Sequence, residues 1–320
     1  MTETLLETQD LSRYFRLAGP WGRGPLLKAV EGVNITVRAG ETLGLVGESG
    51  CGKSTLGRLV LALLAPTQGR VFFGGDEVTA LPKPRLKQMR RQMQIVFQDP
   101  YSSLNPRMMV RRILEEPYII HDLGTKTERR AWVAELLKEV GLGEEHLERY
   151  HHEFSGGQRQ RLGIARALAL KPKLIVADEP VSALDVSIQA QILNLLAELQ
   201  QRYGLTYLFI SHDLSVISQI SDRIAVMYLG RLVEMAPREV FDTAQLHPYT
   251  EALLAAVPLP DPERMFRPPE LKGDPPSPIN IPTGCPFHPR CPAAQFPVCQ
   301  DVFPEYRETA PEHWVSCHFR

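Results

Sequence analysis

The sequence has almost no net charge and no long hydrophobic run. Its 320 residues include 36 basic and 37 acidic side chains, for a formal net charge of −1, which favours neither a nucleic-acid-binding surface nor a polybasic membrane anchor. No apolar stretch approaches the roughly 18 residues that a membrane-spanning helix needs. The first residues, MTETLLETQDLSRYF, lack the basic and apolar regions of a signal peptide. We therefore expect a cytoplasmic protein that reaches a membrane only through a partner.

Cysteine is scarce except at the C-terminal end. Of five cysteines, Cys51 stands alone, and the other four fall within the last 36 residues. Disulfides are not expected in a reducing cytoplasm. The four clustered cysteines are separated by five, seven and seventeen residues, which does not match the short knuckles of common zinc sites. These four residues are Cys285, Cys291, Cys299 and Cys317.

Three interpretations of the cysteine cluster remain open. Four thiolates could ligate an iron–sulfur cluster, and Pro286 and Pro292 directly follow two of the cysteines, as in ferredoxin-like loops. Zinc and free buried thiols are the alternatives. His288, His313 and His318 are near enough in sequence to serve as zinc ligands, although we expect them to be solvated or to pack.

The segment GESGCGKST at 47–55 fits the phosphate-binding pattern G-x-x-x-x-G-K-[ST]. In such a loop the glycines let backbone N–H groups surround phosphate oxygens, Lys53 reaches the β- and γ-phosphates, and Ser54 offers its hydroxyl to Mg²⁺. The apolar run TLGLV before it predicts a buried strand, and TLGRLVLALL after it predicts a helix. This is the strand–loop–helix context that the pattern requires.

The rest of the chain alternates between strand-like and helical segments. Strands are predicted at 4–17, 33–37, 94–100, 173–180 and 206–213, and a hairpin at 69–78. Helices are predicted over 128–142 and from the end of the strand at 173–180 to about 202. This alternation predicts a mostly parallel sheet covered on both faces. From 258 onward the crowded prolines predict a linker or extended arm.

Polar side chains lie at the ends of three of these strands. Asp178 ends the run LIVAD and Glu179 follows it, at the end of the strand where α/β sheets present ligand-binding groups. Asp178 suits a Mg²⁺ shell, and Glu179 suits the positioning or deprotonation of an attacking water. His212 after TYLFIS could donate to a γ-phosphate or to that water, and Gln98 after QIVF could touch Mg²⁺, although histidine and glutamine also serve structural roles at such positions.

A serine and two glycines stand before the helical run QRQRLGIARALAL. Ser155, Gly156 and Gly157 are predicted to cap this helix, and the free N–H groups at its start favour a phosphate. A plain helix cap explains the same residues.

Together these motifs resemble the ATP-binding subunits of ABC transporters. GESGCGKST, Gln98, FSGGQ, LIVADEP, SALD and His212 follow one another with the family's order and spacing, and the resemblance covers roughly residues 4–255. It implies catalytic roles for Lys53, Glu179 and His212, and Mg²⁺ binding by Ser54, Gln98 and Asp178. An aromatic residue near the start would stack on adenine, for which Phe15 is the first choice and Tyr14 the second. The implied ATP-binding residues are Phe15, Gly47, Glu48, Ser49, Gly50, Cys51, Gly52, Lys53, Ser54, Thr55 and Gln98.

The resemblance also implies a dimer of two such subunits. Asp185 would signal across this dimer, and the helical insertion after Gln98 would receive a coupling helix from a membrane subunit. The implied signature residues, which close over the ATP of the partner subunit, are Ser155, Gly156, Gly157 and Gln158.

Further segments resemble the dipeptide and oligopeptide permease branch of the family. They are QDPYSSLNPR at 98–107, ALDVSIQAQILNLL at 183–196, HPYTEALLAAVP at 247–258 and the proline-rich arm. Some members of this branch carry a [4Fe–4S] cluster at the C-terminal end, which favours that interpretation of the four cysteines. Related importers of nickel, glutathione or sugars are alternatives. So is a soluble ABC ATPase acting on nucleic acid, which the absence of a basic excess disfavours.

The expected fold is α/β: a P-loop ATPase core with a mostly parallel sheet, an antiparallel β subdomain at the N-terminus, a helical insertion and a C-terminal extension rich in proline and cysteine. The ATPase domain is predicted at 1–257, with its helical subdomain at about 101–170, and the arm with the cysteine element at 258–320. The expected partners are a second, related ATPase subunit, two membrane permease subunits and, indirectly, an extracytoplasmic binding protein, with the chain at the cytoplasmic face of the inner membrane and no nucleic acid bound.

Overall fold

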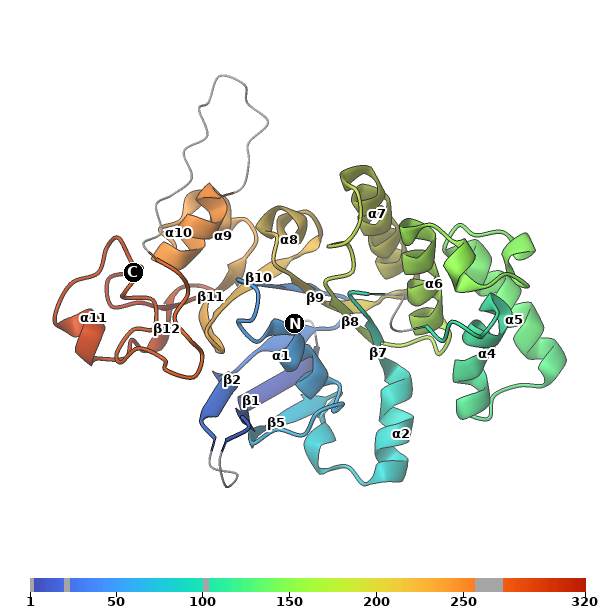
Figure 1. Cartoon of the computed structure of the whole chain (residues 1–320), viewed down its shortest axis with the longest axis horizontal. Coiled ribbons are helices and arrows are strands. Elements are labelled where there is room, and N and C mark those ends of the chain that lie inside the picture. The colour runs from blue at the N-terminus through green and yellow to red at the C-terminus, as the bar shows by residue number, and fades with distance from the viewer. Residues whose placement is uncertain (1–2, 20–23, 100–103, 257–272) are drawn as a thin grey trace, which may run out of the picture. The chain divides into compact units, whose positions relative to one another are not determined.

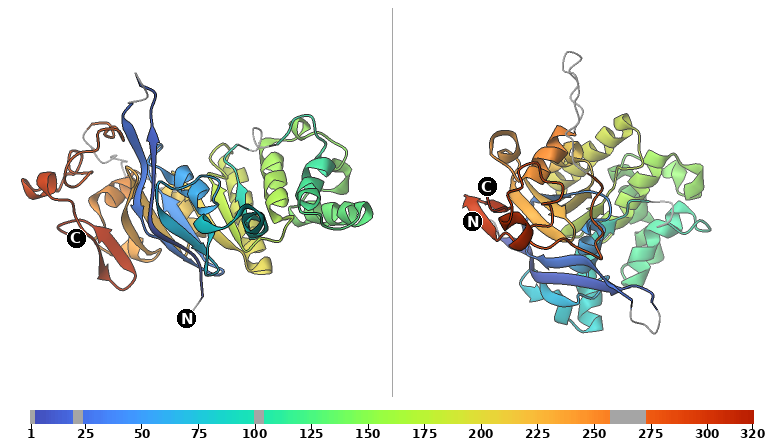
Figure 2. Two further views of the ribbon diagram at one scale, coloured as in Figure 1. Left: turned by 90° about the horizontal axis from the view of Figure 1, so that it is seen from below. Right: turned by 60° about the vertical axis from the view of Figure 1, so that its left-hand side comes forward.

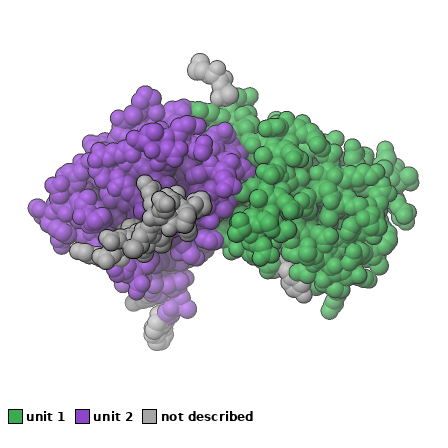
Figure 3. Space-filling model, turned by 90° about the horizontal axis from the view of Figure 1, so that it is seen from above, with its two compact units in different colours: residues 1–3, 38–41, 80–209 green, residues 4–37, 42–79, 210–320 purple. Residues whose placement is uncertain are grey.

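The structure is a computed structural model that describes residues 3–19, 24–99, 104–256 and 273–320. The chain divides into two compact units, which Figure 3 colours separately. Unit 1 comprises residues 1–3, 38–41 and 80–209, and unit 2 comprises residues 4–37, 42–79 and 210–320. Each unit buries its own set of apolar side chains. None of the helices within the described ranges is long and apolar enough to cross a membrane.

Unit 1 combines three strands with a group of helices (Figure 1). The strands run in the order β9-β8-β7, and β7 and β8 are parallel. Every residue of β8 and β9 is buried, as expected for strands of a covered parallel sheet. The elements are β7 (Met93–Val96), β8 (Leu174–Asp178), β9 (Thr206–Ser211), α2 (Lys83–Gln92), α4 (Val110–Ile120), α5 (Lys126–Glu139), α6 (Gly156–Leu168), α7 (Val186–Tyr203), η3 (Glu144–His146) and η4 (His151–Glu153).

The predicted helical insertion is present and has clear local causes. Helix α5 begins at a capping box, in which the Thr125 hydroxyl accepts from the Glu128 N–H at 3.3 Å and the Glu128 carboxylate accepts from the Thr125 N–H at 2.7 Å. It buries Val133 and Leu137 on one face and ends before Gly141, whose φ is +71°. Figure 2 shows α4, α5 and α6 in green as one helical group.

Unit 2 begins with an antiparallel sheet, which confirms the predicted N-terminal β subdomain. The strand order is β2-β1-β5-β6, and β3 also pairs with β1. The long blue strands in Figure 2 are β1 and β2. The predicted hairpin at 69–78 is formed by β5 and β6. The elements are β1 (Thr4–Arg16), β2 (Leu26–Val33), β3 (Thr36–Arg38), β5 (Gln68–Phe73), β6 (Asp76–Glu77) and η2 (Val78–Ala80).

The strand predicted at 33–37 is interrupted. Val33 ends β2, Asn34 and Ile35 are not part of a strand, and β3 begins at Thr36. The Asn34 side chain accepts from the Asp10 N–H at 2.7 Å, so a side chain takes the place of a backbone partner at this point. The β-branched pattern of the segment therefore spans a short break between two strands that both pair with β1.

A second sheet of unit 2 carries the phosphate loop. Its strands follow the order β12-β13-β11-β10-β4, where β4 and β10 are parallel and the other pairs are antiparallel. All five residues of β4 and all six of β10 are buried. The elements are β4 (Thr42–Val46), β10 (Arg223–Tyr228), β11 (Arg231–Pro237), β12 (Tyr306–Ala310), β13 (His313–Ser316), α1 (Lys53–Val60), α8 (Leu214–Ile220), α9 (Val240–Thr243), α10 (Pro248–Ala255) and α11 (Val298–Asp301).

The last strands are therefore part of unit 2 and complete its sheet. Most of the predicted proline-rich arm, residues 258–272, lies outside the described residues. The next described segment begins at residue 273 and includes β13. Val315 and Trp314 of β13 pair with β11. The predicted boundary between an ATPase domain and a C-terminal element stays a prediction.

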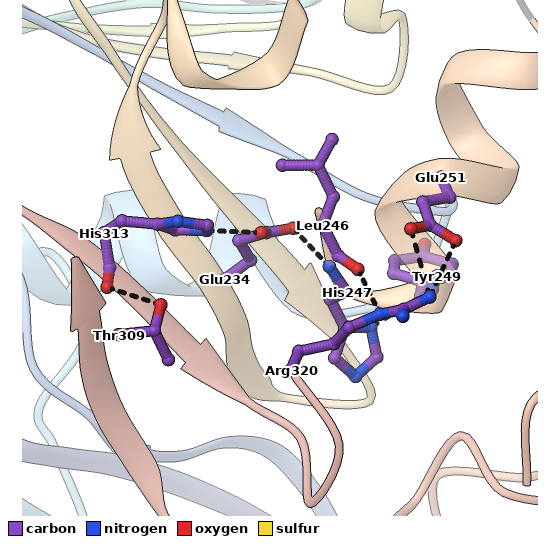
Figure 4. A network of polar contacts seen from close by, with 8 residues as sticks. All are labelled: Glu234, Leu246, His247, Tyr249, Glu251, Thr309, His313 and Arg320. Carbon is purple, nitrogen blue, oxygen red and sulfur yellow. Dashed lines mark hydrogen bonds and ion pairs between the residues drawn. The ribbon is translucent and has the colours of Figure 1, made fainter. Parts of the chain in front are cut away.

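A buried polar network holds the C-terminal strands in place (Figure 4). Glu234 on β11 is fully buried, and its carboxylate lies 2.8 Å from His313 Nε2 and accepts from the His247 N–H at 3.1 Å. Burial lowers the pKa of His247 to about 3, so its ring is neutral and Nδ1 accepts from the Tyr249 N–H at 3.1 Å. One carboxylate thus joins β11, β13 and the start of α10.

A second contact fixes the chain terminus beside this network. The Arg320 Nε donates to the Leu246 carbonyl at 2.9 Å, and its terminal nitrogen pairs with the Glu251 carboxylate at 3.2 Å (Figure 4). The Glu251 side chain is 45% exposed, so this pair contributes little to stability.

We expect Glu234→Gln to destabilise the protein by about 1–3 kcal/mol, because a buried amide NH₂ would face a donor that the carboxylate now satisfies. Urea unfolding followed by tryptophan fluorescence measures the change. Glu251→Gln is the matched control and should cost about 0.5 kcal/mol or less. Equal losses in the two variants would contradict the importance of the buried network.

Candidate functional site

The phosphate loop lies in unit 2 between the fully buried β4 and the start of α1 at Lys53. Gly47 and Gly52 permit the close packing of the loop. An added Cβ at Gly47 would lie 2.1 Å from the Met227 carbonyl oxygen, and one at Gly52 would lie 2.0 Å from the Ala29 carbonyl oxygen. Gly52 also has a φ of +110°, which L side chains rarely adopt. The backbone behind the loop thus dictates glycine at both positions.

Lys53 folds its side chain back over the loop. The residue is only 4% exposed, and its ammonium group donates to the carbonyl oxygens of Gly47 at 2.7 Å and Glu48 at 3.0 Å. These contacts hold a buried positive charge at the neck of the loop, where a phosphate anion would be attracted. The Cys51 thiol is buried beside it, and burial raises the pKa of that thiol. The loop thiol therefore stays protonated near neutral pH.

Two residues outside the motif hold the loop from the C-terminal half of the chain. The Tyr249 hydroxyl accepts from the Glu48 N–H at 2.9 Å, and the Arg290 guanidinium pairs with the Glu48 carboxylate at 2.9 Å. No sequence pattern pointed to either residue, because both lie far from the loop along the chain. The segment HPYTEALLAAVP, which contains Tyr249, resembles one branch of the family but does not by itself indicate this contact.

Unit 1 brings the predicted carboxylates together with Gln98. Asp178 ends β8 and is 5% exposed. Glu179 follows with a φ of +48°, and its backbone carbonyl accepts from the Ser182 hydroxyl at 3.1 Å. The Gln98 amide, on the segment after β7, donates to the Glu179 carboxylate at 3.0 Å. The positive φ turns Glu179 away from the strand direction, a conformation that is found at functional sites.

Ser155 caps helix α6 as predicted. Its hydroxyl accepts from the Gln158 N–H at 3.3 Å, and the Gln158 side-chain oxygen accepts from the Ser155 N–H at 3.1 Å. The residue pair forms a capping box, and Ser155 and Gly156 are both exposed. An added Cβ at Gly157 would lie 2.6 Å from Ile188 Cγ2. The exposed helix start can receive an anion from outside the unit.

The remaining predicted residues are exposed or partly exposed. Asp185 is the exposed N-cap residue of α7, and His212 is exposed between β9 and α8. On β1, the Arg13 guanidinium lies 4.7 Å from the ring centre of Phe15. The Tyr14 ring instead lies 5.7 Å from the Lys28 ammonium, and its hydroxyl donates to Glu31 at 3.3 Å. Both aromatic rings thus have neighbouring cations, and the adenine-stacking role of Phe15 stays a prediction.

Comparisons with known proteins agree with this geometry. Residues 30–182 match the family described as ABC transporter, and residues 233–299 match the family described as oligopeptide/dipeptide transporter, C-terminal region. The chain is 52% identical to the oligopeptide transport ATP-binding protein AppF of Bacillus subtilis (strain 168), over 99% of this chain and 97% of that protein. It is also 52% identical to a probable peptide ABC transporter ATP-binding protein, y4tS of Sinorhizobium fredii, over 100% and 91% of the two chains.

The chain belongs to the ATP-binding subunits of ABC transporters. This ABC subunit also resembles solved structures, one of which is described as a dimeric post-hydrolysis state of the ATP-binding cassette MJ0796 bound to ADP and Pi. The identity is 29%, the TM-score is 0.65, and the match covers 73% of this chain and 99% of that chain. The predicted fold class and family are confirmed, and the ABC subunit is an ATPase.

The C-terminal cysteines of the ABC subunit are near one another, but they do not form a site for a single metal ion. Burial raises the pKa of Cys285 to about 11, and the nearby thiols of Cys291, Cys317 and Cys299 add to this rise. In the part of the chain that the structure describes, no three His, Cys, Asp or Glu residues are grouped so that they could hold a metal ion. The predicted iron–sulfur cluster and its zinc alternative therefore gain no support from the comparisons or from this grouping.

The three nearby histidines have other hydrogen-bond partners. His288 Nδ1 lies 2.9 Å from the Cys285 carbonyl oxygen, His313 pairs with Glu234, and His318 Nε2 lies 2.9 Å from the Val302 carbonyl oxygen. These contacts agree with the expected packing or solvated roles.

We expect Gly52→Ala to weaken ATP binding by more than about tenfold, because its Cβ would meet the Ala29 carbonyl and force the loop to move, at a cost above about 1.4 kcal/mol. Titration with a fluorescent ATP analogue measures the affinity.

Gly50→Ala is the matched control for this loop substitution. Gly50 has a φ of +79°, so the variant carries a backbone strain of the same kind, but no atom lies within 4 Å of the added Cβ. A smaller loss of affinity is expected, and losses of equal size would show that close packing behind Gly52 is unimportant.

Proposed function

We propose that this chain is the ATP-hydrolysing motor of a peptide importer, in which ATP binding and hydrolysis drive substrate movement through membrane subunits. The match of residues 233–299 to the C-terminal region of oligopeptide and dipeptide transporters carries the proposal, because this segment lies outside the ATPase motifs that all ABC proteins share. The names of relatives at 52% identity over nearly the whole chain point the same way. Importers of nickel, glutathione or sugars are the alternatives.

Each predicted site residue has a part in this proposed function. The phosphate loop from Gly47 to Thr55 binds the phosphates, with Lys53 turning from the loop carbonyls to the β- and γ-phosphates. Glu179 positions or deprotonates the attacking water, and its contact with Gln98 keeps the carboxylate oriented at the end of β8. His212 donates a hydrogen bond to the γ-phosphate or to the water, and Phe15 stacks on adenine.

Ser54, Gln98 and Asp178 are the residues that would hold Mg²⁺. A hydroxyl, an amide oxygen and a buried carboxylate form an oxygen-only donor set, which fits this ion. Bound Mg²⁺ would neutralise charge that develops on the phosphate oxygens.

A second ATPase subunit is the proposed partner at the exposed signature residues. The signature residues close over the ATP of this partner; they are Ser155, Gly156, Gly157 and Gln158. Asp185 signals across the dimer. Exposure supports the assignment, because Val186, next to Asp185, is apolar and 81% exposed. Solved relatives of this fold are described as dimeric. In the peptide-permease branch the partner is a related chain, so a heterodimer is proposed.

Two membrane permease subunits are the proposed partners of the helical insertion. At the end of α4, Ile119 and Ile120 are 44% and 52% exposed, which leaves apolar surface for a coupling helix. The chain then lies at the cytoplasmic face of the membrane through these subunits. An extracytoplasmic binding protein delivers the substrate to them, and no nucleic acid takes part.

We expect Glu179→Gln to lower ATP hydrolysis about 10²–10⁴-fold while leaving ATP binding intact, because only the water-activating step is lost. In cells that carry the membrane subunits, uptake of labelled dipeptides and oligopeptides should be abolished. Glu145→Gln, at a carboxylate whose side chain is 74% exposed, is the control and should keep both activities. Uptake of nickel or glutathione instead of peptide would contradict the proposed substrate class.

We also propose that Cys285, Cys291, Cys299 and Cys317 hold a [4Fe–4S] cluster. The sulfurs of Cys285, Cys291 and Cys299 accept hydrogen bonds from the backbone N–H groups of residues 287, 293 and 295. Hydrogen bonds of this kind stabilise metal-bound thiolates. A single zinc ion would need its sulfurs within roughly 4 Å of one another, since each Zn–S bond is about 2.3 Å. A [4Fe–4S] cluster separates its ligands more widely.

Anaerobic purification should yield about four irons and four sulfides per chain if this proposal holds. Cys291→Ser should lose the iron and the broad visible absorbance, whereas Cys51→Ser, outside the element, should keep both. Stoichiometric zinc would replace the cluster with a structural ion, and a metal-free chain would leave four free thiols. Neither result bears on the ATPase assignment.

A further inference from the structure

One residue of the phosphate loop is held at three points. The Glu48 N–H donates to the Tyr249 hydroxyl at 2.9 Å, and its carbonyl accepts from the Lys53 ammonium at 3.0 Å. Its carboxylate accepts two hydrogen bonds from Arg290, one from each terminal nitrogen, at 2.9 and 3.0 Å. Such a paired contact fixes both the distance and the orientation of the carboxylate. The position of the Glu48 carbonyl, and with it that of Lys53, therefore depends on groups outside the loop.

Arg290 itself is firmly placed. Its residue is 6% exposed, its N–H donates to the Phe287 carbonyl at 3.0 Å, and one guanidinium nitrogen also reaches the Tyr228 hydroxyl at 3.5 Å. Phe287 is 1% exposed, and its ring centre lies 5.4 Å from those of both Tyr228 and Tyr249. This aromatic cluster fixes the turn that carries Arg290 against the end of β10 and the start of α10.

The same turn belongs to the cysteine element. Arg290 directly precedes Cys291, and the Cys285 N–H donates to the Cys299 carbonyl at 2.9 Å. The chain between Cys285 and Cys291 is thus closed at its base by a neighbouring cysteine segment, and Arg290 projects from it to the loop. Arg290 and Glu48 are 242 residues apart in sequence, so only the folded C-terminal element can make this contact.

We propose that Arg290 is a positioning residue of the nucleotide site, which sets the shape of the phosphate loop through Glu48. The cysteine element thereby contributes to ATP affinity without contacting ATP. Because the side-chain contacts of Arg290 are with Glu48 and Tyr228, and not with Glu179 or His212, its contribution falls on nucleotide binding and not on the chemical step. The proposal rests on ATP binding by the loop and goes beyond it in making the C-terminal element part of the site.

Arg290→Met in the full chain tests this. Methionine keeps much of the side-chain volume but removes the paired hydrogen bonds. The Kd for a fluorescent ADP or ATP analogue is expected to rise about tenfold, which corresponds to about 1.4 kcal/mol. In steady-state hydrolysis the loss should appear as a higher KM, with kcat within about threefold of the original value. Arg290→Lys keeps the charge but not the planar guanidinium, so its Kd should lie between those of the original chain and of Arg290→Met.

A double-mutant cycle separates positioning from general damage. Glu48→Gln alone should weaken binding to a similar extent, and combining it with Arg290→Met should add little further loss, because both remove the same contact. Glu48→Gln leaves every residue of the C-terminal element unchanged, so it carries the test if Arg290→Met fails to fold. Additive losses, or an affinity within about twofold of the original in both single variants, would overturn the proposal.

Arg320→Met is the matched control. Arg320 also fastens the C-terminal element, through Leu246 before α10 and Glu251 on α10, but these contacts do not involve the loop. Its variant should bind nucleotide within about twofold of the original chain. An equal loss in both arginine variants would mean that any loosening of the element suffices, and would overturn a specific role for Arg290. Failure of the unaltered chain to bind nucleotide would instead overturn the ATPase assignment itself.

Discussion

Close backbone packing behind the phosphate loop is the constraint on which the nucleotide site depends. Carbonyl oxygens of Met227 and Ala29 stand where side chains at Gly47 and Gly52 would be. The Gly230 N–H also donates to the Cys51 carbonyl at 2.9 Å, which ties the loop to the turn after β10. The loop therefore takes its shape from β2 and β10 as much as from its own sequence. Those strands are placed in turn by the sheets of unit 2, and through them by the pairing of β13 with β11.

The C-terminal residues accordingly do more than extend the chain. Glu234 joins β11 to β13 and to the start of α10, and α10 presents Tyr249 to the loop. Arg290 reaches the same loop residue from the cysteine element. Two independent connections thus run from the last third of the chain to the phosphate site, one through a buried carboxylate and one through a paired arginine. Both lie within unit 2, where the loop itself is found.

Local signals made part of this predictable from sequence. The phosphate loop, the Ser155 cap and the α5 helix each depend on residues within a few positions of one another, and the structure has all three. Prediction failed where distant partners decide. The segment at 33–37 has strand-like composition, but at Asn34 a side-chain bond to Asp10 on β1 interrupts the backbone pairing between the end of β2 and the start of β3. The contact of Arg290 with Glu48 spans 242 residues and leaves no periodic trace in the sequence.

The sheet that carries the phosphate loop has one part that a local pattern indicates and another part that it does not. β10 and β11 are buried apolar runs joined by a turn at Leu229 and Gly230, and that pattern alone would have indicated a hairpin. β12 and β13 carry no comparable signal, since four of the five residues of β12 are exposed and the strand is defined by its pairing. The cysteine cluster shows the same limit, because spacing along the chain does not report how thiols meet in space.

The capping box of α6 has a further consequence for Ser155. A hydroxyl group has one proton to give and two lone pairs to accept with. The cap uses a lone pair, because Ser155 Oγ accepts from the Gln158 N–H. The proton of the hydroxyl is not needed for the cap and can be given to an incoming oxyanion. Ser155 Oγ can thus cap the helix and donate a hydrogen bond to an anion at the same time, so anion binding does not require loss of the cap.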